Sequence, residues 1–260
     1  MIANEVPHSR INAIRFFKEY IRSNKNELAT KKVFDFSTGS GYIASLFEKT
    51  GAEMRIFDLF PEQNQYASSK CERIDLQERL QLPDQCADMI LCCETVECIP
   101  DQYNLFREFA RVLRPNGVLI LTTANPSSLR GRLSQFMMEG EHYSTPIPNE
   151  FNALAKWPGS NYGYFSKLFI SGILRLRTLA AISSLKIFKV HRSPRSSTAY
   201  LLLPIFFPLI YFFSLKSLKK QIRGNVENRL AYQQIFEINT SLNVLLGKHL
   251  IIEFKKTDGC

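Results

Sequence analysis

The segment from Lys31 to Gln63, KKVFDFSTGSGYIASLFEKTGAEMRIFDLFPEQ, decides the fold class of this chain. It predicts an apolar strand, a turn rich in glycine and serine, a helix and a second strand. A strand, a helix and a strand in this order are typical of the opening unit of a parallel α/β sheet. The stretch from Phe60 to Glu72 is short, so we expect the usual crossover helix before the third strand, around Glu72–Asp75, to be shortened or missing.

Strands and helices continue to alternate after this unit. The run Ala87–Cys93 is continuously apolar, which predicts a central strand buried on both faces. The remaining expected elements are helices over Ile11–Ile21, Asp101–Leu113 and Tyr164–Ile182, and strands over Val118–Thr123, Leu185–His191 and His249–Lys255. We therefore predict an α/β protein with a Rossmann-like, doubly wound sheet of about seven strands, as such alternation favours.

Charge is distributed unevenly along the 260 residues. Met1–Ala110 holds 13 basic and 17 acidic residues, whereas Arg111–Cys260 holds 20 and 7. Between Phe151 and Val226 there are 12 Lys or Arg residues and no Asp or Glu. Such a stretch predicts an anionic neighbour, either lipid headgroups or nucleic acid, although a solvated basic face is the plainer alternative.

The segment Ser196–Leu215, SSTAYLLLPIFFPLIYFFSL, is uncharged over 20 residues and has basic residues on both sides. It is long enough to cross a bilayer. Two prolines interrupt it, however, and a crossing would separate the last strand from its sheet, so a re-entrant or interfacial helical hairpin fits better. A buried core helix or a dimer interface is the alternative. We expect one α/β domain over residues 1–192 and 248–260 and a membrane-prone helical insertion over residues 193–247, between the last two strands.

Two further features bear on the compartment. Met1–Phe17 lacks a basic stretch followed by an apolar one, so no secretory signal is expected. The six cysteines show no C-x-x-C spacing and are interpreted as reduced. Together with the insertion, this predicts a cytoplasmic protein, peripheral or monotopic on the inner membrane face.

The turn Asp35-Phe-Ser-Thr-Gly39-Ser-Gly41 follows the first strand and opens a helix, where parallel α/β sheets bind nucleotide-like ligands. Small residues at this turn let the backbone approach a ligand closely. Asp58 ends the second strand, where a carboxylate can accept both hydroxyl groups of a ribose. Taken singly, these acids could equally be ordinary strand-end caps; the ordered set favours a cofactor site.

The chain resembles the class I S-adenosylmethionine-dependent methyltransferases, in particular the group that acts on small molecules and lipids. The resemblance covers roughly residues 30–127 and adds four stretches to the turn: Ile74–Leu76, Ala87–Leu91, Cys93–Pro100 and Arg111–Gly117 with the following Leu119–Thr123.

The resemblance implies S-adenosyl-L-methionine as cofactor and a role for each matching residue. Asp35, Ser37, Gly39 and Gly41 should border the methionine end, Asp58 the ribose, Asp75 and Leu76 the adenine, and Cys93 and Glu94 the sulfonium. The sequence departs from the family at two positions: Ser37 stands where a first glycine is usual, and Cys98 stands where a histidine is common.

The acceptor is inferred from what the chain has and lacks near the pocket. Cys92-Cys93-Glu94-Thr95 replaces the Asn/Asp-Pro-Pro-Tyr/Phe motif of enzymes that methylate amino groups of bases, and a Pro-Cys nucleophile is absent. His142, in a long loop after the fifth strand, is the first candidate for a general base, with Glu94 as the second catalytic residue. Tyr143 and Asn125 are candidate substrate contacts. A surface or packing role for His142 is the alternative, and no metal site is expected.

The leading hypothesis is a membrane-associated methyltransferase that acts on an oxygen of a lipid, a lipid-linked glycan or an isoprenoid-type acceptor. A second hypothesis keeps the enzyme but gives it a soluble acceptor, with the insertion as a homodimer contact. A third is a catalytically degenerate, cofactor-binding membrane scaffold. Nucleic-acid binding ranks below these, because the basic stretch adjoins an apolar run.

Overall fold

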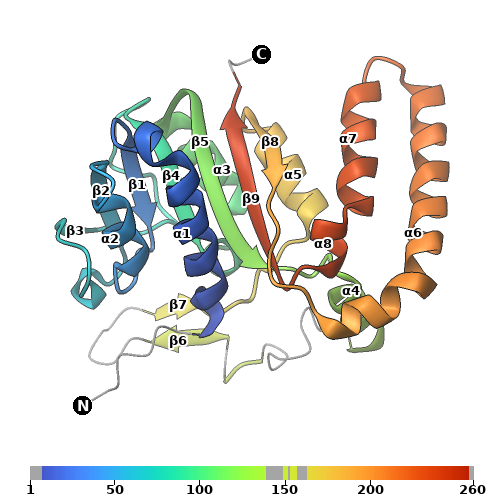
Figure 1. The fold of residues 1–260 in the computed structure, drawn as a ribbon, viewed down its shortest axis with the longest axis horizontal. Helices are drawn as coiled ribbons and strands as arrows, with labels where there is room; N and C mark the ends of the chain where they lie inside the picture. Colours follow the sequence, from blue (N-terminus) through green and yellow to red (C-terminus); the bar gives the residue numbers. More distant parts are fainter. Residues whose placement is uncertain (1–7, 139–148, 152, 157–162, 258–260) are drawn as a thin grey trace.

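The structure, a computed structural model, describes residues 8–138, 149–151, 153–156 and 163–257. Its centre is a seven-stranded sheet with the order β3-β2-β1-β4-β5-β9-β8 (Figure 1). The strands are β1 (Lys32–Phe36), β2 (Glu53–Asp58), β3 (Cys71–Arg73), β4 (Ala87–Cys93), β5 (Leu113–Ala124), β8 (Leu185–Val190) and β9 (His249–Lys256). The predicted Rossmann-like α/β fold with seven strands is confirmed.

Strand β1 pairs in parallel with β2 on one side and with β4 on the other. The order of the strands along the chain therefore reverses between β1 and β4, which is where open α/β sheets bind their ligands. Strand β9 runs antiparallel between β5 and β8. Because of this direction, β9 begins at the edge of the sheet where β4 and β5 end.

Helices cover both faces of the sheet (Figure 1). Alternate residues of β4 explain this, because Met89 and Leu91 pack with α1 and α2, while Ile90 packs on the opposite face with α3, α5 and α7. The helices are α1 (His8–Leu28), α2 (Tyr42–Glu48), α3 (Gln102–Val112), α4 (Leu129–Met138), α5 (Ile173–Ala181), α6 (Ser197–Gly224), α7 (Arg229–Thr240) and α8 (Leu242–Leu246).

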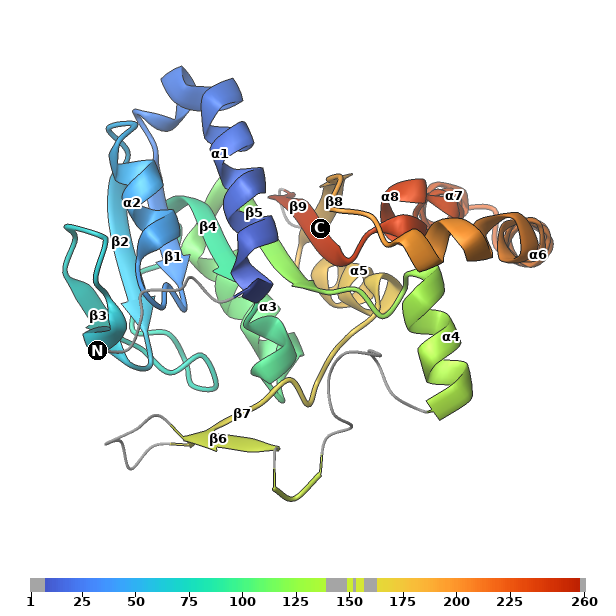
Figure 2. The ribbon, with the colours of Figure 1, turned by 60° about the horizontal axis from the view of Figure 1, so that its bottom comes forward.

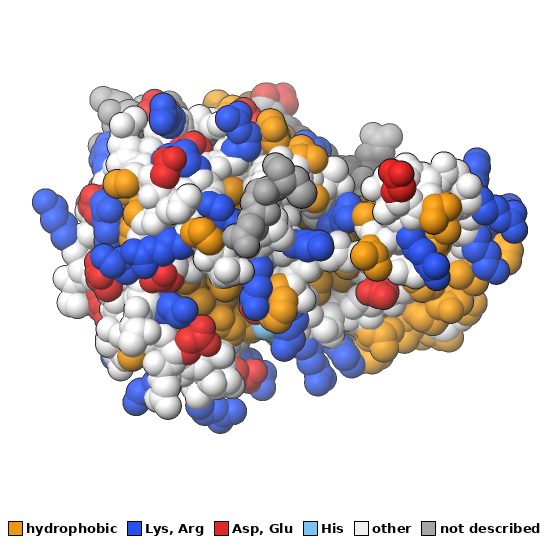
Figure 3. All heavy atoms as spheres, turned by 90° about the horizontal axis from the view of Figure 1, so that it is seen from above, with side chains coloured by type: hydrophobic (Ala, Val, Ile, Leu, Met, Phe, Trp, Pro, Cys, Tyr) orange, Lys and Arg blue, Asp and Glu red, His pale blue; other side chains and the backbone are white. Residues whose placement is uncertain are grey.

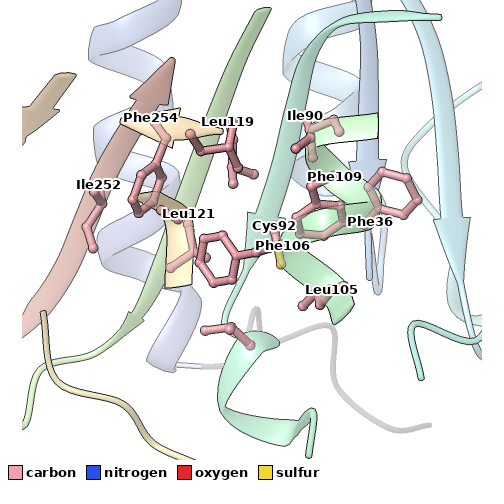
Figure 4. Packing of buried hydrophobic residues seen from close by; sticks show 14 of the residues in the cluster. Phe36, Ile90, Cys92, Leu105, Phe106, Phe109, Leu119, Leu121, Ile252 and Phe254 are labelled. Carbon is pink, nitrogen blue, oxygen red and sulfur yellow. The ribbon is translucent and has the colours of Figure 1, made fainter. Parts of the chain in front are cut away.

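The larger core lies between the sheet and α3. Rings from the helix and from three strands meet there, among them Phe36, Phe106, Phe109 and Phe254, which are fully buried (Figure 4). Phe36 and Phe109 have ring centroids 5.2 Å apart, and Phe106 and Phe254 are 5.7 Å apart. This packing fixes β4 and β5 side by side, so their carboxyl ends form a rigid base for a site.

Three local expectations meet different outcomes. Only a short 3₁₀ helix, η1 (Pro61–Gln63), follows β2 before β3, so the missing crossover helix is confirmed. The helix predicted over Tyr164–Ile182 is wrong in its first half, because α5 begins only at Ile173. The earlier residues Gly163–Phe165 form β7, which pairs with β6 (Leu154–Lys156) in a separate two-stranded sheet. This hairpin lies beneath the carboxyl ends of the strands (Figure 2).

The segment between β8 and β9 forms α6, α7 and α8. Helix α6 continues through Pro204 and Pro208 for 28 residues, and α7 returns beside it as a helical hairpin (Figure 1). Among the described residues, α6 is the one helix that is long and apolar enough to cross a membrane by length and composition.

Candidate active site

The turn after β1 has a backbone that few residues tolerate. Ser37, Gly39 and Gly41 have φ values of 58°, 57° and 76°, in the left-handed region. For glycine this conformation carries no steric cost, whereas for serine it does. Ser37 therefore adopts the backbone that the glycine usual at this position would take, and the departure from the family pattern is accommodated at the expense of local strain.

Two buried carboxylates hold this turn. Thr38 Oγ1 donates to Asp35 Oδ2 at 2.8 Å, and Asp35 is 2% exposed. Asp58 accepts from the Gly39 amide at 2.8 Å with one oxygen and from the Phe60 amide at 2.9 Å with the other. The predicted contact of Asp58 with a ribose stays a prediction.

The residues predicted to border an adenine lie just beyond β3. Asp75 Oδ1 accepts the Gln77 amide at 2.9 Å, which closes a tight turn. Leu76 is buried in the larger core. The Ile74 amide donates to the carbonyl oxygen of Asp58 at 3.1 Å, so this turn is tied to the end of β2.

A second strained residue follows β4, next to the first turn in the sheet. Glu94 has a φ of 53°, and its amide donates to the carbonyl oxygen of Thr122 on β5 at 2.8 Å. Cys93, the last residue of β4, is buried. Non-glycine residues in this conformation cost about 1–3 kcal/mol and concentrate at functional sites. Because Phe36 and Cys92 are register partners, the two strained loops flank the reversal point of the sheet.

A buried cluster of charged side chains surrounds Glu94. Lys167 Nζ lies 3.1 Å from Glu94 Oε2 and 3.3 Å from Glu97 Oε1. Glu97 is fully buried, and its other oxygen accepts from Thr123 Oγ1 at 2.7 Å. His249 Nδ1 lies 3.3 Å from Glu94 Oε1. We call these four side chains, Glu94, Glu97, Lys167 and His249, the charged cluster.

Burial and neighbouring charges shift the pKa values of the two carboxylates of the charged cluster in opposite directions. Burial by itself would raise the pKa of Glu94, but the close contact and charge interaction with His249 and the charge of Lys167 outweigh it, so the pKa is lowered. Burial and the neighbouring Glu94 charge raise the pKa of Glu97. Burial would lower the pKa of Lys167, yet Glu97 and Glu94 hold it above its ordinary value. The charged form is therefore more favoured for Glu94 than for Glu97, and Lys167 lies within ion-pair distance of both carboxylates.

Segments distant in sequence deliver Lys167 and His249 to this edge. The Phe169 amide donates to the carbonyl oxygen of Glu97 at 2.9 Å, and Gln102 Nε2 donates to the carbonyl oxygens of Phe169 at 2.6 Å and of Val96 at 2.9 Å. These bonds fix the chain around Lys167. His249 lies at this edge of the sheet because β9 begins there, with His249 paired to Ala124 at the end of β5.

Sequence reasoning missed both residues. Lys167 carries no local signal of a site. The position of His249 at the start of an antiparallel closing strand could have placed it at the carboxyl ends of the parallel strands.

Other predicted site residues are not brought into this cluster. His142 and Tyr143 lie outside the residues that the structure describes. Asn125 is 1% exposed, and its amide nitrogen donates to the carbonyl oxygens of Val244 and Gly247, both at 2.8 Å. This nitrogen ties the end of β5 to the segment before β9, so a substrate contact, which stays a prediction, would have to use Oδ1.

The β6–β7 hairpin approaches the site from below. The rings of Tyr164 on β7 and Phe60 after β2 meet edge to face with centroids 5.8 Å apart. The hairpin therefore lies against the end of the strand that bears Asp58 (Figure 2).

Comparisons with known proteins agree with this geometry. Residues 34–121 match a family described as "Methyltransferase domain". A ubiquinone biosynthesis O-methyltransferase of Xanthomonas euvesicatoria is 30% identical over 128 residues, which are 46% of this chain and 52% of that protein. A protein of the same name from Actinobacillus pleuropneumoniae is 28% identical over 132 residues, 46% of this chain and 56% of that one. The chain thus spans about half the length of the curated relatives it matches.

Solved structures share the fold over nearly the whole chain. An S-adenosylmethionine-dependent methyltransferase from Mesorhizobium loti superposes with a TM-score of 0.54 at 14% identity, covering 96% of this chain and 99% of that one. One from Listeria monocytogenes gives 0.54 at 11% identity, covering 95% and 99%. At these identities the likeness concerns the fold.

The site fits the cofactor that these proteins share. The small-residue turn with left-handed backbone lies at the reversal point of the sheet, where a ligand can approach the main chain. Asp58 lies buried beside it and accepts the Gly39 amide, and Asp75 and Leu76 follow just beyond the adjoining strand β3. These residues would hold S-adenosylmethionine, and Glu94 with Cys93 would border its reacting end.

Proposed function

We propose that the chain, whose residues 34–121 match a methyltransferase domain, is a class I S-adenosylmethionine-dependent methyltransferase that methylates a hydroxyl oxygen of a lipid, a lipid-linked glycan or an isoprenoid-type acceptor at a membrane surface. The observation that carries the proposal is the combination of the charged cluster at the cofactor edge with an exposed apolar helix on the same chain. The relatives are named O-methyltransferases of ubiquinone biosynthesis, which supports oxygen as the accepting atom and an isoprenoid-type acceptor.

When bound, S-adenosylmethionine supplies an activated methyl group on a sulfonium. The chain then has to align the acceptor in line with that group, exclude water and remove the hydroxyl proton. The buried Glu94 and its partners are suited to the last task, because a neutral hydroxyl is a poor nucleophile until its proton is accepted. The sequence after β4 lacks the motifs of enzymes that methylate nucleic-acid bases.

Helix α6 supports a membrane surface as the place of action. Only 6% of the most apolar 18-residue stretch of this helix is buried inside the protein. One face packs on Leu129, Leu245 and Leu246 through residues such as Phe206 and Phe207. The opposite face is exposed; its apolar side chains, which we call the α6 stripe, are Leu201, Ile205, Leu209, Phe212 and Phe213, from 52% to 74% exposed.

Charge next to the α6 stripe complements anionic lipid. Lys216, Lys219, Lys220 and Arg223 continue the helix beyond the stripe. Figure 3 shows hydrophobic side chains along the flank of the lobe formed by α6 and α7, with Lys and Arg at its rim. Each basic residue near an anionic leaflet contributes about 1 kcal/mol, so the basic end and the stripe would act together.

An in-plane position fits α6 better than a membrane crossing. Ser214 accepts from Asn239 on α7 at 2.7 Å, and Asn239 in turn accepts from Arg132 on α4 at 2.6 Å. A crossing would draw these polar partners into hydrocarbon, at a cost of several kcal/mol. Lying at the interface, the helix keeps them on its protein side. We therefore propose a monotopic or peripheral protein on the cytoplasmic face, with residues 193–247 as the attaching unit.

Methyl transfer is tested with methyl-labelled S-adenosylmethionine and a bacterial total-lipid extract. The proposal expects label in the organic phase that resists mild base, a treatment that cleaves methyl esters. This label should be absent when the lipid extract is omitted. Label that appears only with water-soluble phenols would favour the soluble-acceptor alternative. No label with either acceptor would refute the enzymatic proposal.

Membrane attachment is tested by flotation with vesicles of phosphatidylcholine, alone or with phosphatidylglycerol. The wild type should float with the anionic vesicles, and Ile205→Glu should not. Ile182→Glu is the matched control, because Ile182 is 59% exposed but lies at the end of α5, away from the α6 stripe. Equal flotation of the two variants would refute the role of the stripe. A dimer that dissociates only in Ile205→Glu, without wild-type flotation, would instead support the interface alternative.

A further inference from the structure

We propose that His249 is the general base that removes the acceptor proton, with Glu94 as its positioning residue. The inference rests on the proposed function, which it deepens by assigning the base to a residue other than His142. Four observations carry it: the backbone position of His249, the environment of its ring, the balance of charges around Glu94 and the pairing of the other described buried histidine.

The main chain of His249 is fixed at the carboxyl edge of the sheet. It pairs with Ala124 at the end of β5, on the strand next to β4 and its Glu94 loop. Ser193 Oγ donates to the His249 carbonyl oxygen at 2.7 Å, and the His249 amide donates back to Ser193 Oγ at 3.4 Å. The ring therefore starts from a rigid backbone, as a catalytic group requires.

The ring of His249 has one side turned to a carboxylate. Nδ1 is buried without a hydrogen bond of good geometry, and Glu94 Oε1 lies 3.3 Å from it. A small rotation of the ring would direct a proton on Nδ1 to Glu94 Oε1, and this tautomer leaves the Nε2 lone pair for a substrate proton. In the part of the chain that the structure describes, no hydrogen bond engages Nε2. The His249 side chain is 18% exposed, which leaves it within reach of a ligand.

The charges around Glu94 suit a base that becomes positive during the reaction. Glu94 is 4% exposed and lies between His249 and Lys167, and Thr122 Oγ1 donates to Glu94 Oε1 at 3.3 Å. A carboxylate fixed beside an imidazole orients it and stabilises the imidazolium that forms. Lys167 is shared with Glu97 and holds Glu94 in place. The groups that face His249 are thus Glu94 directly, with Lys167 and Glu97 behind it.

His191 provides the contrast. Its Nε2 lies 2.8 Å from Glu253 Oε2, and its ring packs on Phe16 with centroids 4.8 Å apart. These two interactions hold the ring between α1 and β9. His191 also has a carboxylate partner, but its Nε2 is bound to Glu253 and its ring packs on Phe16, so we assign it a structural role.

The proposed step balances without a further reactant. The O–H bond of the acceptor breaks and its proton moves to His249 Nε2. The oxygen forms a bond to the methyl carbon, and the electron pair of the broken C–S bond stays on sulfur. The positive charge of the sulfonium is thereby replaced by that of the imidazolium beside Glu94, and the proton then leaves to solvent.

The test compares His249→Asn, Glu94→Gln and His191→Gln in the full-length chain. The measurements are calorimetric binding of S-adenosylmethionine and steady-state transfer to the lipid extract across a pH series. For His249→Asn we expect cofactor affinity within about threefold of the wild type and a fall in kcat of about 10²–10⁴-fold, the usual contribution of a general base. The acid limb of the wild-type rate profile should vanish in this variant.

Glu94→Gln separates positioning from catalysis. It should lower kcat but retain the acid limb, because His249 remains as the base while losing the carboxylate that positions it. His191→Gln should keep kcat within about twofold. An active His249→Asn variant with an unchanged pH profile would overturn the assignment and leave the proposed function intact. A wild type that binds the cofactor but transfers no methyl group would overturn the proposed function itself.

Discussion

Replacing Lys167 by methionine tests whether the charged cluster holds together as its geometry indicates. The ammonium lies 3.1 Å from Glu94 and 3.3 Å from Glu97, two carboxylates that are 4% and 0% exposed. Removing one partner of a buried ion pair typically costs about 3–5 kcal/mol. Lys167 itself is 33% exposed, so solvent screening reduces the loss, and we expect about 2–3 kcal/mol at pH 7.5.

The loss should depend on pH with a defined sign. The pKa of Glu97 is raised by burial and by Glu94, so the stability it contributes is present at low pH and is lost as pH rises through its folded value. Without Lys167, a proton on Glu97 removes one of the two facing charges. Glu97 carries that proton to a larger extent at pH 5 than at pH 7.5. The free energy lost in Lys167→Met should therefore be at least about 1 kcal/mol smaller at pH 5 than at pH 7.5.

The assay is urea unfolding followed by far-ultraviolet circular dichroism at both pH values, without cofactor. Lys186→Met is the control, because Lys186 is an exposed residue on β8, and surface changes usually stay within about 0.5 kcal/mol. The reasoning is refuted if Lys167→Met behaves like Lys186→Met, or if its loss is the same at pH 5 and pH 7.5.

Four further changes have outcomes that follow from the structure. Gly41→Ala should lower the free energy of unfolding by about 2–3 kcal/mol, because φ is +76° and the new Cβ would stand 2.1 Å from Asn64 Oδ1. Gly51→Ala, with φ at +92° but nothing nearer than 3.8 Å, should cost only about 1–2 kcal/mol in the same urea titration. Arg111→Met should cost about 2–4 kcal/mol, because its guanidinium bonds Glu108, Asp84 and two carbonyl oxygens; a loss no larger than that of the exposed Arg107→Met would contradict this. Asn125→Leu should lower the thermal midpoint by several degrees, because two carbonyl oxygens lose their donor; an unchanged midpoint would show that this link is dispensable.

The parts of the fold that sequence reasoning predicted are those with strong local patterns. Ala87–Cys93 is a strand with the predicted bounds, since a continuous apolar run between turn signals fits a strand buried on both faces. The closing pair β8 and β9 was also predicted, as was the insertion between them. Each of these follows from the period of apolar residues within one short segment.

The error over Tyr164–Ile182 has a nonlocal cause. Phe165 and Phe169 fit a helical spacing, but Tyr164 pairs with Ala155 in the β6–β7 hairpin, and Phe169 bonds to Glu97. Tertiary contacts therefore override the periodic pattern, and α5 begins only after them. The same contacts bring Lys167 to Glu94, which is why no local reading could assign it to the site.

The candidate cofactor residues are close in sequence, whereas the candidate acceptor residues are brought together only by the tertiary fold. Asp35, Gly39 and Asp58 lie in one compact unit, so their proximity follows from the order of strand, turn and strand. His249 reaches Glu94 only through the antiparallel placement of β9. His142, which the sequence favoured as the base, was chosen for its loop position alone.

The measurement that tests the central claim most directly is calorimetric titration of the purified chain with S-adenosylmethionine and, separately, with S-adenosylhomocysteine. We predict one binding site for each ligand, mutual competition, and an affinity reduced by about 10-fold or more in Asp58→Asn, which loses a charged acceptor. Circular dichroism should show that this variant remains folded. A folded wild-type protein that binds neither ligand would contradict the account.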